Sequence, residues 1–169
     1  MRIAIIYATK SGTTRECAEI LAEQLHRHDV SVFDVSKAPD LEQYDVIVLG
    51  FSIRMGRAIK SARRFMKENA DILVRKRASY FLCCGFIDCF DEYAKKAIPQ
   101  KLLAAASDVS CFGGHLDPSR VKGLDKLVVK SVRAEILGGG DNGDQRDDMV
   151  LPTILDQNIV QFAERIKGC

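Results

Sequence analysis

Residues 2–14 read RIAIIYATKSGTT, and this stretch decides the fold. Residues 2–8 form an almost unbroken apolar run, which is typical of a strand that is buried on both faces of a parallel sheet. Residues 9–14 are mostly small and polar, and apolar residues repeat at helical spacing over 12–28. The sequence therefore begins with a buried strand, a hydroxyl-rich loop and a helix.

Strand and helix patterns continue to alternate along the chain. Four further strands are predicted at 30–34, 45–50, 78–84 and 109–116. Helices are predicted at 58–73, at 89–106 with an interruption near Pro99, and around 155–166. Because apolar strands that alternate with helices form parallel sheets, we expect an α/β protein with a five-stranded parallel sheet and helices on both faces. We expect one domain over 1–169, with residues 117–150 as a long insertion after the fifth strand.

The loop between the first strand and the first helix has the chemistry of a phosphate-binding site. Free backbone N–H groups and the helix dipole attract an anion to a helix N-terminus, and Gly12 lets the backbone approach a ligand closely. A helix cap needs one hydroxyl, whereas this loop has four, on Thr9, Ser11, Thr13 and Thr14. The loop lacks the Gly-Lys-Ser/Thr ending of a Walker motif, so it is not a loop of that type. Three spaced glycines at 138–143 lack a strand–turn–helix context, so we interpret them as a loop.

Composition excludes several classes of function. The net charge of +2 is too small to favour nucleic-acid binding. No apolar run has the length of a membrane-spanning helix and the N-terminus lacks a signal-peptide pattern, so we expect a cytoplasmic protein. Its six cysteines should then be free thiols, with Cys17 and Cys111 as small core residues. The closely spaced cysteines at 83–89 lack the further cysteine of an iron–sulfur run, so we expect no metal.

The hydroxyl-rich loop resembles the FMN phosphate loop of flavodoxins. The matching residues are Thr9, Lys10, Ser11, Gly12, Thr13 and Thr14. In that family, hydroxyls and backbone amides bind the phosphate of FMN. The resemblance covers nearly the whole chain and implies a flavodoxin-like three-layer sandwich with strand order 2-1-3-4-5. It also implies FMN as the cofactor and a function in electron transfer or flavin-dependent oxidoreduction, without indicating a catalytic acid or base.

Three more loops are expected at the same end of the sheet, where ligands bind in such folds. After the third strand, Ser52-Ile53-Arg54-Met55-Gly56 resembles the turn beside the flavin ring, and the peptide between Met55 and Gly56 would direct its carbonyl toward N5 of the flavin. After the fourth strand, Cys84-Gly85-Phe86 resembles the loop on the other side of the ring. Phe86 is the candidate for stacking, although a core position stays open. After the fifth strand, His115 is either a cofactor or substrate contact or a surface residue.

Positive charge distinguishes this chain from the acidic flavodoxins that replace ferredoxins. Arg54 and Arg57 fall within the expected ring loop. A nearby cation stabilises anionic reduced flavin, by about 1 kcal/mol for a partly screened arginine, which corresponds to roughly 40 mV for one electron. We therefore expect a less reducing flavin than in an acidic flavodoxin.

Residues 120–133 form a second basic feature. As a helix, this segment has an apolar face and a face with lysines and an arginine, so it either lies on an anionic membrane surface or packs on the body of the protein. Together with residues 52–56, the long basic insertion resembles the menaquinone-dependent protoporphyrinogen oxidases, flavodoxin-like enzymes associated with the membrane. This resemblance implies oxidation of a porphyrinogen through FMN, with a quinone as acceptor.

Three functions remain open at this point. The first is an FMN electron carrier, or a general flavodoxin-like redox protein, that docks on a redox partner protein. The second is a quinone-dependent protoporphyrinogen dehydrogenase that acts on small molecules and lies peripherally at the inner face of the membrane. The third is a non-redox module that binds a partner. None of them implies a particular oligomeric state.

Overall fold

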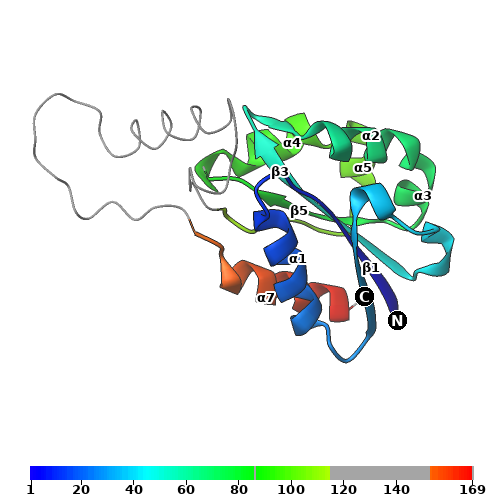
Figure 1. Cartoon of the computed structure of the whole chain (residues 1–169). Coiled ribbons are helices and arrows are strands. Elements are labelled where there is room, and N and C mark those ends of the chain that lie inside the picture. The colour runs from blue at the N-terminus through cyan, green and yellow to red at the C-terminus, as the bar shows by residue number, and fades with distance from the viewer. Residues whose placement is uncertain (86, 115–152, 169) are drawn as a thin grey trace, which may run out of the picture.

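A computed structural model describes residues 1–85, 87–114 and 153–168 (Figure 1). Its strands are β1 (Arg2–Ala8), β2 (Asp29–Asp34), β3 (Val46–Arg54), β4 (Arg57–Ala58), β5 (Ser79–Cys83) and β6 (Val109–Cys111). Its α-helices are α1 (Thr13–Gln24), α2 (Lys60–Glu68), α3 (Ala70–Arg75), α4 (Phe90–Ala97), α5 (Gln100–Ala105) and α7 (Asp156–Lys167). Short 3-10 helices are η1 (Val35–Lys37), η2 (Leu41–Gln43) and η3 (Ile87–Cys89). Phe86, His115 and the predicted insertion at 117–150, including the basic segment 120–133, lie outside the described residues.

The main sheet has the strand order β2-β1-β3-β5-β6, and each neighbouring pair of strands is parallel. Since β5 and β6 are the fourth and fifth predicted strands, the predicted order 2-1-3-4-5 is confirmed. Because these strands run in the same direction, the loops that follow β1, β3, β5 and β6 lie at one edge of the sheet. We call this the carboxyl edge, and it is where ligands bind in folds of this kind.

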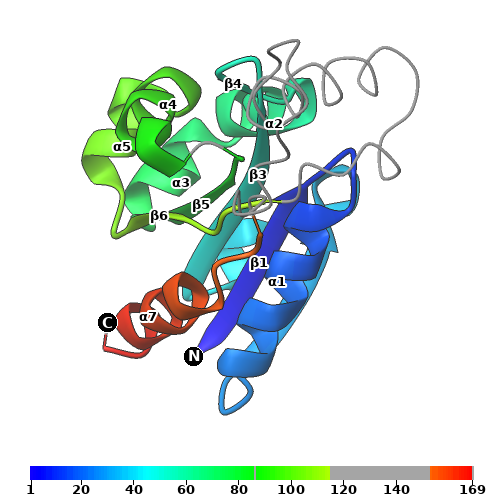
Figure 2. The same ribbon diagram turned by 90° about the vertical axis from the view of Figure 1, so that its left-hand side faces the viewer.

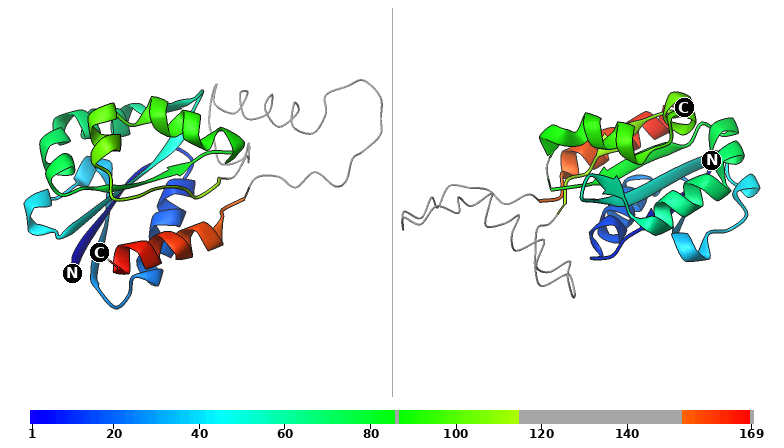
Figure 3. Two further views of the ribbon diagram at one scale, coloured as in Figure 1. Left: turned by 180° about the vertical axis from the view of Figure 1, so that it is seen from behind. Right: turned by 90° about the horizontal axis from the view of Figure 1, so that it is seen from above.

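Helices cover both faces of the sheet, as the apolar strands predict (Figures 1 and 3). In β1, Ile3 and Ile5 belong to a core with α1 and α7, whereas Ile6 and Ala8 belong to a core with helices α2 to α5. All four side chains are at most 1% exposed. Figure 2 shows the two helical layers from the side. The strand is apolar throughout because it has no face toward solvent.

The third strand extends past its predicted end at Gly50. The expectation that residues 52–54 form a loop is wrong, because β3 continues to Arg54 and turns back to pair with β4. In this antiparallel hairpin, Ile53 pairs with Ala58 and Arg54 with Arg57. The turn itself is therefore reduced to Met55 and Gly56.

Two predicted helices also differ from the structure, and one predicted interruption is confirmed. Helix α1 ends at Gln24 because the chain then enters β2, where the N–H of Asp29 donates to the carbonyl of Met1 at 3.1 Å. The pattern over 58–73 is two helices that meet at Asn69, whose side-chain amide donates to the carbonyl of Phe65 at 3.0 Å and competes with helix continuation. The interruption near Pro99 is confirmed, since it separates α4 from α5.

The last strand of the sheet is shorter than predicted. Strand β6 ends at Cys111 because Gly113 adopts a left-handed φ of 71°. The chain there forms an antiparallel bridge with Ile154, just before α7. The start of the C-terminal segment therefore returns to the end of β6.

An aromatic cluster packs directly on the backbone of β3. A Cβ atom at Gly50 would lie 1.9 Å from Cζ of Phe81 on β5. The Phe81 ring stacks on Phe112 with 4.4 Å between ring centroids, and Phe162 of α7 contacts Phe112 edge-on at 5.3 Å. Glycine at position 50 leaves the space that this cluster occupies.

Gly50→Ala is expected to lower the free energy of unfolding by about 1–3 kcal/mol, because the added methyl overlaps the Phe81 ring. Equilibrium urea unfolding measures the loss. In a Phe81→Leu background the same alanine should cost clearly less, since the ring is gone. An equal cost in both backgrounds would show that the steric explanation is wrong.

Candidate functional site

The loop after β1 forms a compact turn in front of α1. The backbone N–H of Gly12 donates to Oγ1 of Thr9 at 3.0 Å. Gly12 has a left-handed φ of 91°, and apart from its neighbours in the chain no atom of the described residues lies within 4 Å of the place where its Cβ would be. The space beside the Gly12 backbone is therefore open to a ligand.

The start of α1 holds donors that suit an anion. The carbonyl of Gly12 accepts the first intrahelical bond, from the N–H of Glu16 at 3.0 Å, so the N–H groups of residues 13–15 have no acceptor within the helix. The hydroxyl of Thr13 is buried and has no hydrogen-bond partner among the residues that the structure describes. Burying an unpaired hydroxyl is unfavourable, so a ligand oxygen that accepts a bond here would remove that cost. The donor set fits a phosphate group.

Thr14 and Ser52 connect this loop to the neighbouring strand. Oγ1 of Thr14 lies 2.7 Å from Oγ of Ser52 on β3, and both residues are buried. The Thr14 hydroxyl also interacts with the thiol of Cys83 on β5. Because its hydroxyl is occupied by protein groups, Thr14 supports the loop through its side chain and has only its backbone N–H to present to an anion.

The β3–β4 hairpin brings the predicted Met55–Gly56 turn to the carboxyl edge. Both residues have left-handed φ angles, 49° for Met55 and 70° for Gly56, as a two-residue hairpin turn of type I′ requires. Such a conformation is strained for methionine, whose side chain is 88% exposed here. Ile53 packs against the core beneath the helices from α2 to α5. The turn is therefore held by its flanking strands.

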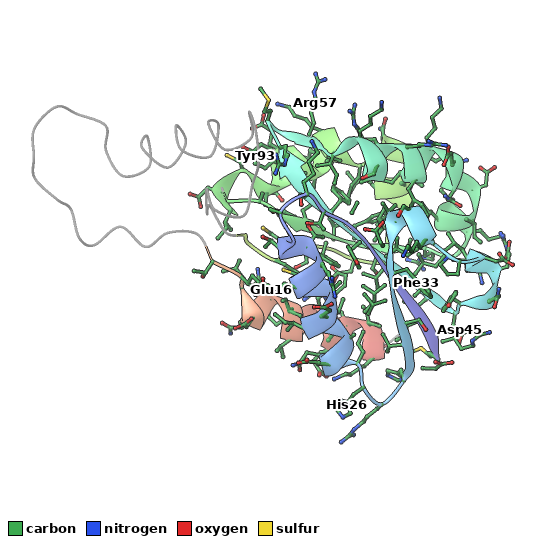
Figure 4. The ribbon with its side chains drawn as sticks, viewed as in Figure 1. Glu16, His26, Phe33, Asp45, Arg57 and Tyr93 are labelled. Atoms are coloured by element: carbon green, nitrogen blue, oxygen red, sulfur yellow. The ribbon has the colours of Figure 1, made fainter. Side chains whose placement is uncertain are left out.

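Tyr93 is a candidate that the sequence patterns did not indicate. It lies on α4, and its Cε1 atom is 3.5 Å from the place where a Cβ of Gly56 would be. Burial and the neighbouring Cys89 raise the pKa of Tyr93, which therefore stays a neutral phenol at physiological pH. Figure 4 shows Tyr93 and Arg57 at the rim of the molecule near the end of β3. The position of Tyr93 beside Gly56 follows only from the packing of α4 on the hairpin, because Tyr93 belongs to a helix and not to one of the loops that follow the strands.

The segments after β5 and β6 are joined at the same edge. The N–H of Cys84 donates to the carbonyl of Gly113 at 2.9 Å. A Cβ on Gly114 would lie 3.5 Å from the backbone of Cys84, so the two segments are in close contact. Gly85 follows directly and is partly exposed. The structure thus brings the loop at 9–14, the hairpin turn and the Cys84–Gly85 segment to one edge.

Comparison with known proteins agrees with this architecture. The family model described as "Flavodoxin domain" matches residues 4–142. The chain belongs to the flavodoxin domain family. It is also 32% identical to protoporphyrinogen IX dehydrogenase [quinone] from Escherichia coli K12, over 180 aligned residues that cover 98% of this chain and 94% of the relative.

Solved flavodoxin structures share the fold. A short-chain flavodoxin associated with a non-canonical PDU bacterial microcompartment aligns with a TM-score of 0.56 and 16% identity, covering 99% of this chain and 98% of the other. A cysteine mutant of flavodoxin from Pseudomonas aeruginosa aligns with a TM-score of 0.55 and 12% identity, covering 99% and 100%. These likenesses confirm the flavodoxin-like α/β fold.

Family membership confirms the predicted class of function. This flavodoxin-family protein is an FMN-binding redox protein, and FMN is its cofactor. No helix among the described residues is both long and apolar enough to cross a bilayer. Within the same residues, no three His, Cys, Asp or Glu side chains are grouped so that they could hold a metal ion.

Thr14→Val is expected to lower the free energy of unfolding of the apoprotein by about 1–2 kcal/mol, because it leaves the buried Ser52 hydroxyl without its partner. Ser52→Ala should have a similar effect. Since one shared hydrogen bond is lost in each case, the double variant should resemble the single variants in urea unfolding. Fully additive losses would contradict a direct bond between the two hydroxyls.

Proposed function

We propose that this protein is an FMN-dependent dehydrogenase that oxidises a porphyrinogen and passes the electrons to a quinone. The observation that carries the proposal is the 32% identity with a quinone-dependent protoporphyrinogen IX dehydrogenase, because it extends over nearly the full length of both chains. The basic hairpin at the carboxyl edge supports it further. We also propose that the chain is a single domain built around this site.

The loop after β1 is the proposed site of the FMN phosphate. The hydroxyls of Thr9, Ser11 and Thr13 and the N–H groups at the start of α1 would bind the phosphate oxygens. In this arrangement Thr13 gains the partner that its buried hydroxyl lacks within the described part of the chain. Lys10 is exposed and would add positive charge at the same end of the loop.

The hairpin turn and the segment after β5 are the proposed neighbours of the flavin ring. When bound, FMN supplies the chemistry of accepting and releasing electrons. The carbonyl of Met55, in the peptide that joins it to Gly56, would accept a hydrogen bond from the N–H group at N5 of the reduced flavin. Tyr93 packs against Gly56 and steadies this turn. On the other side, Gly85, which is partly exposed, would lie next to the ring.

The arginines of the hairpin would act on both cofactor and substrate. Arg54 and Arg57 pair in register across the hairpin, so both lie next to the Met55–Gly56 turn. Their positive charge favours the anionic reduced flavin over the oxidised one. The same charge attracts the carboxylate side chains of a porphyrinogen. A flavin with a less negative midpoint potential accepts electrons from a substrate more readily. A flavin with a very negative potential is instead a strong reductant.

Turnover tests the proposed function directly. The full chain, loaded with FMN, is expected to convert protoporphyrinogen IX to fluorescent protoporphyrin under anaerobic conditions when a short-chain menaquinone is added. Omission of either FMN or the quinone should abolish the reaction. A protein that binds FMN and exchanges single electrons reversibly, but consumes no porphyrinogen, would be an electron carrier and would refute the proposal.

Thr13→Val is expected to weaken FMN binding by roughly tenfold or more, because a hydrogen bond to a charged group contributes about 1.5–3 kcal/mol. The apoprotein should keep its stability or gain some, since valine removes a buried hydroxyl that has no partner. Flavin fluorescence titration measures the affinity. Thr153→Val, at an exposed position, is the matched control. Unchanged affinity in the Thr13 variant would exclude a phosphate contact for this hydroxyl.

Arg57→Gln is expected to lower the midpoint potential of bound FMN by up to about 40 mV, because one cation beside the reduced flavin is removed. Redox titration of the bound flavin measures the shift. Arg27→Gln is the control, since Arg27 lies before β2 at the opposite edge of the sheet. Equal potentials for wild type and the Arg57 variant would place this arginine away from the ring.

A further inference from the structure

Two cysteines from neighbouring strands meet at the carboxyl edge. Cys84 follows β5 and Cys111 ends β6, and their Sγ atoms are 3.5 Å apart. The two residues are 5% and 4% exposed, so each retains a small accessible surface. None of the proposed steps of flavin chemistry uses this pair of thiols.

The surroundings of Cys111 favour its thiolate. The backbone N–H of Gly113 donates to Sγ of Cys111 at 3.4 Å. The Cys84 thiol, together with the backbone N–H groups of Gly113 and Cys84, lowers the pKa of Cys111 to about 7, although burial acts in the opposite direction. Because the thiolate is the nucleophilic form of cysteine, Cys111 is the more reactive member of the pair.

A second pair of buried cysteines provides a contrast within the same protein. Sγ of Cys83 lies 3.7 Å from Sγ of Cys17, in the core between the sheet and helices α1 and α7. The contact with Cys17 and the burial raise the pKa of Cys83 well above its ordinary value. Proximity of two sulfur atoms alone therefore does not create a reactive pair, and Cys111 differs from Cys83 in accepting a bond from a backbone N–H, that of Gly113.

We propose that Cys84 and Cys111 form a peroxide-reactive dithiol, in which Cys111 is oxidised first and Cys84 then forms a disulfide with it. The Cys111 thiolate attacks one oxygen of hydrogen peroxide, so the O–O bond breaks, a sulfenic acid forms, and the released hydroxide takes up a proton to become water. The Cys84 sulfur then attacks the sulfenic sulfur and releases a second water with its own proton. Two cysteines lose two electrons in total, and one peroxide gains them.

The geometry suits both steps. Hydrogen peroxide is small and neutral, so it can reach a sulfur atom that a larger disulfide reagent reaches only poorly. The backbone bond between Cys84 and Gly113 already holds the segments after β5 and β6 together. The sulfur atoms are therefore in contact before oxidation, and they have to approach from 3.5 Å to the length of an S–S bond, about 2.05 Å. The proposal depends on these protein atoms alone and not on the identity of the substrate.

Peptide mapping of the oxidised full-length protein tests the proposal. Fully reduced protein is treated with a small excess of hydrogen peroxide, alkylated, and digested without reductant for mass spectrometry. The expected product is a link between the peptide that contains Cys84 and the peptide that contains Cys111, reversible by dithiothreitol. In Cys84→Ser the sulfenic acid on Cys111 should persist and be trapped by dimedone.

Matched controls separate this pair from the other thiols. Cys89→Ser removes a cysteine from the same stretch of chain and should leave the link intact, whereas Cys111→Ser should abolish both the link and the dimedone adduct. Cys17 should be oxidised roughly tenfold or more slowly than Cys111, because a buried thiol in apolar surroundings is inert. A wild-type map without the Cys84–Cys111 link, or equal oxidation of Cys17 and Cys111, would overturn the proposal. Neither result would bear on porphyrinogen turnover, so the two proposals fail separately.

Discussion

Parallel pairing of β1, β3, β5 and β6 is the constraint on which the rest of the molecule depends. Since parallel strands need crossover connections, helices must cover both faces of the sheet, and the strands become apolar throughout. The same pairing collects the following loops at one edge. Hydrogen bonds then hold the segments at this edge together. The hydroxyls of Thr14 and Ser52 are bonded to each other, and the N–H of Cys84 donates to the carbonyl of Gly113.

Two separate parts of the site, the start of α1 and the β3–β4 hairpin, determine its electrostatics. At the start of α1, neutral donors suit an anion, because backbone N–H groups and hydroxyls are already oriented by the helix and the turn before it. At the hairpin, two arginine side chains supply positive charge, because Arg54 and Arg57 flank the turn. In the proposed function, the first place would determine how tightly the cofactor binds, and the second how easily it accepts electrons.

The cysteines show how strongly local surroundings change one residue type. Cys83 and Cys84 are adjacent in sequence but belong to two different thiol pairs. Cys83 meets Cys17 in an apolar core and its pKa rises, whereas Cys84 meets Cys111 beside backbone N–H donors and the pKa of Cys111 falls. Cys111 accepts a hydrogen bond from the backbone N–H of Gly113, whereas contact with Cys17 and burial disfavour the thiolate of Cys83.

The sequence by itself determined the two helical layers and the hydroxyl-rich loop, because burial on both faces and helix-end chemistry leave patterns in neighbouring residues. The strand order followed from the resemblance to flavodoxins. Only the tertiary structure decided that β3 continues to Arg54, that Tyr93 packs on Gly56 and that Thr14 bonds to Ser52. It also decided which cysteines meet. The contacts of Tyr93, of Thr14 and of the cysteines join residues far apart in the chain, and a local pattern carries no information about a distant partner. The hairpin that replaced the predicted loop is a local contact, in which antiparallel pairing with Ala58 outweighed the loop-like polarity of residues 52–57.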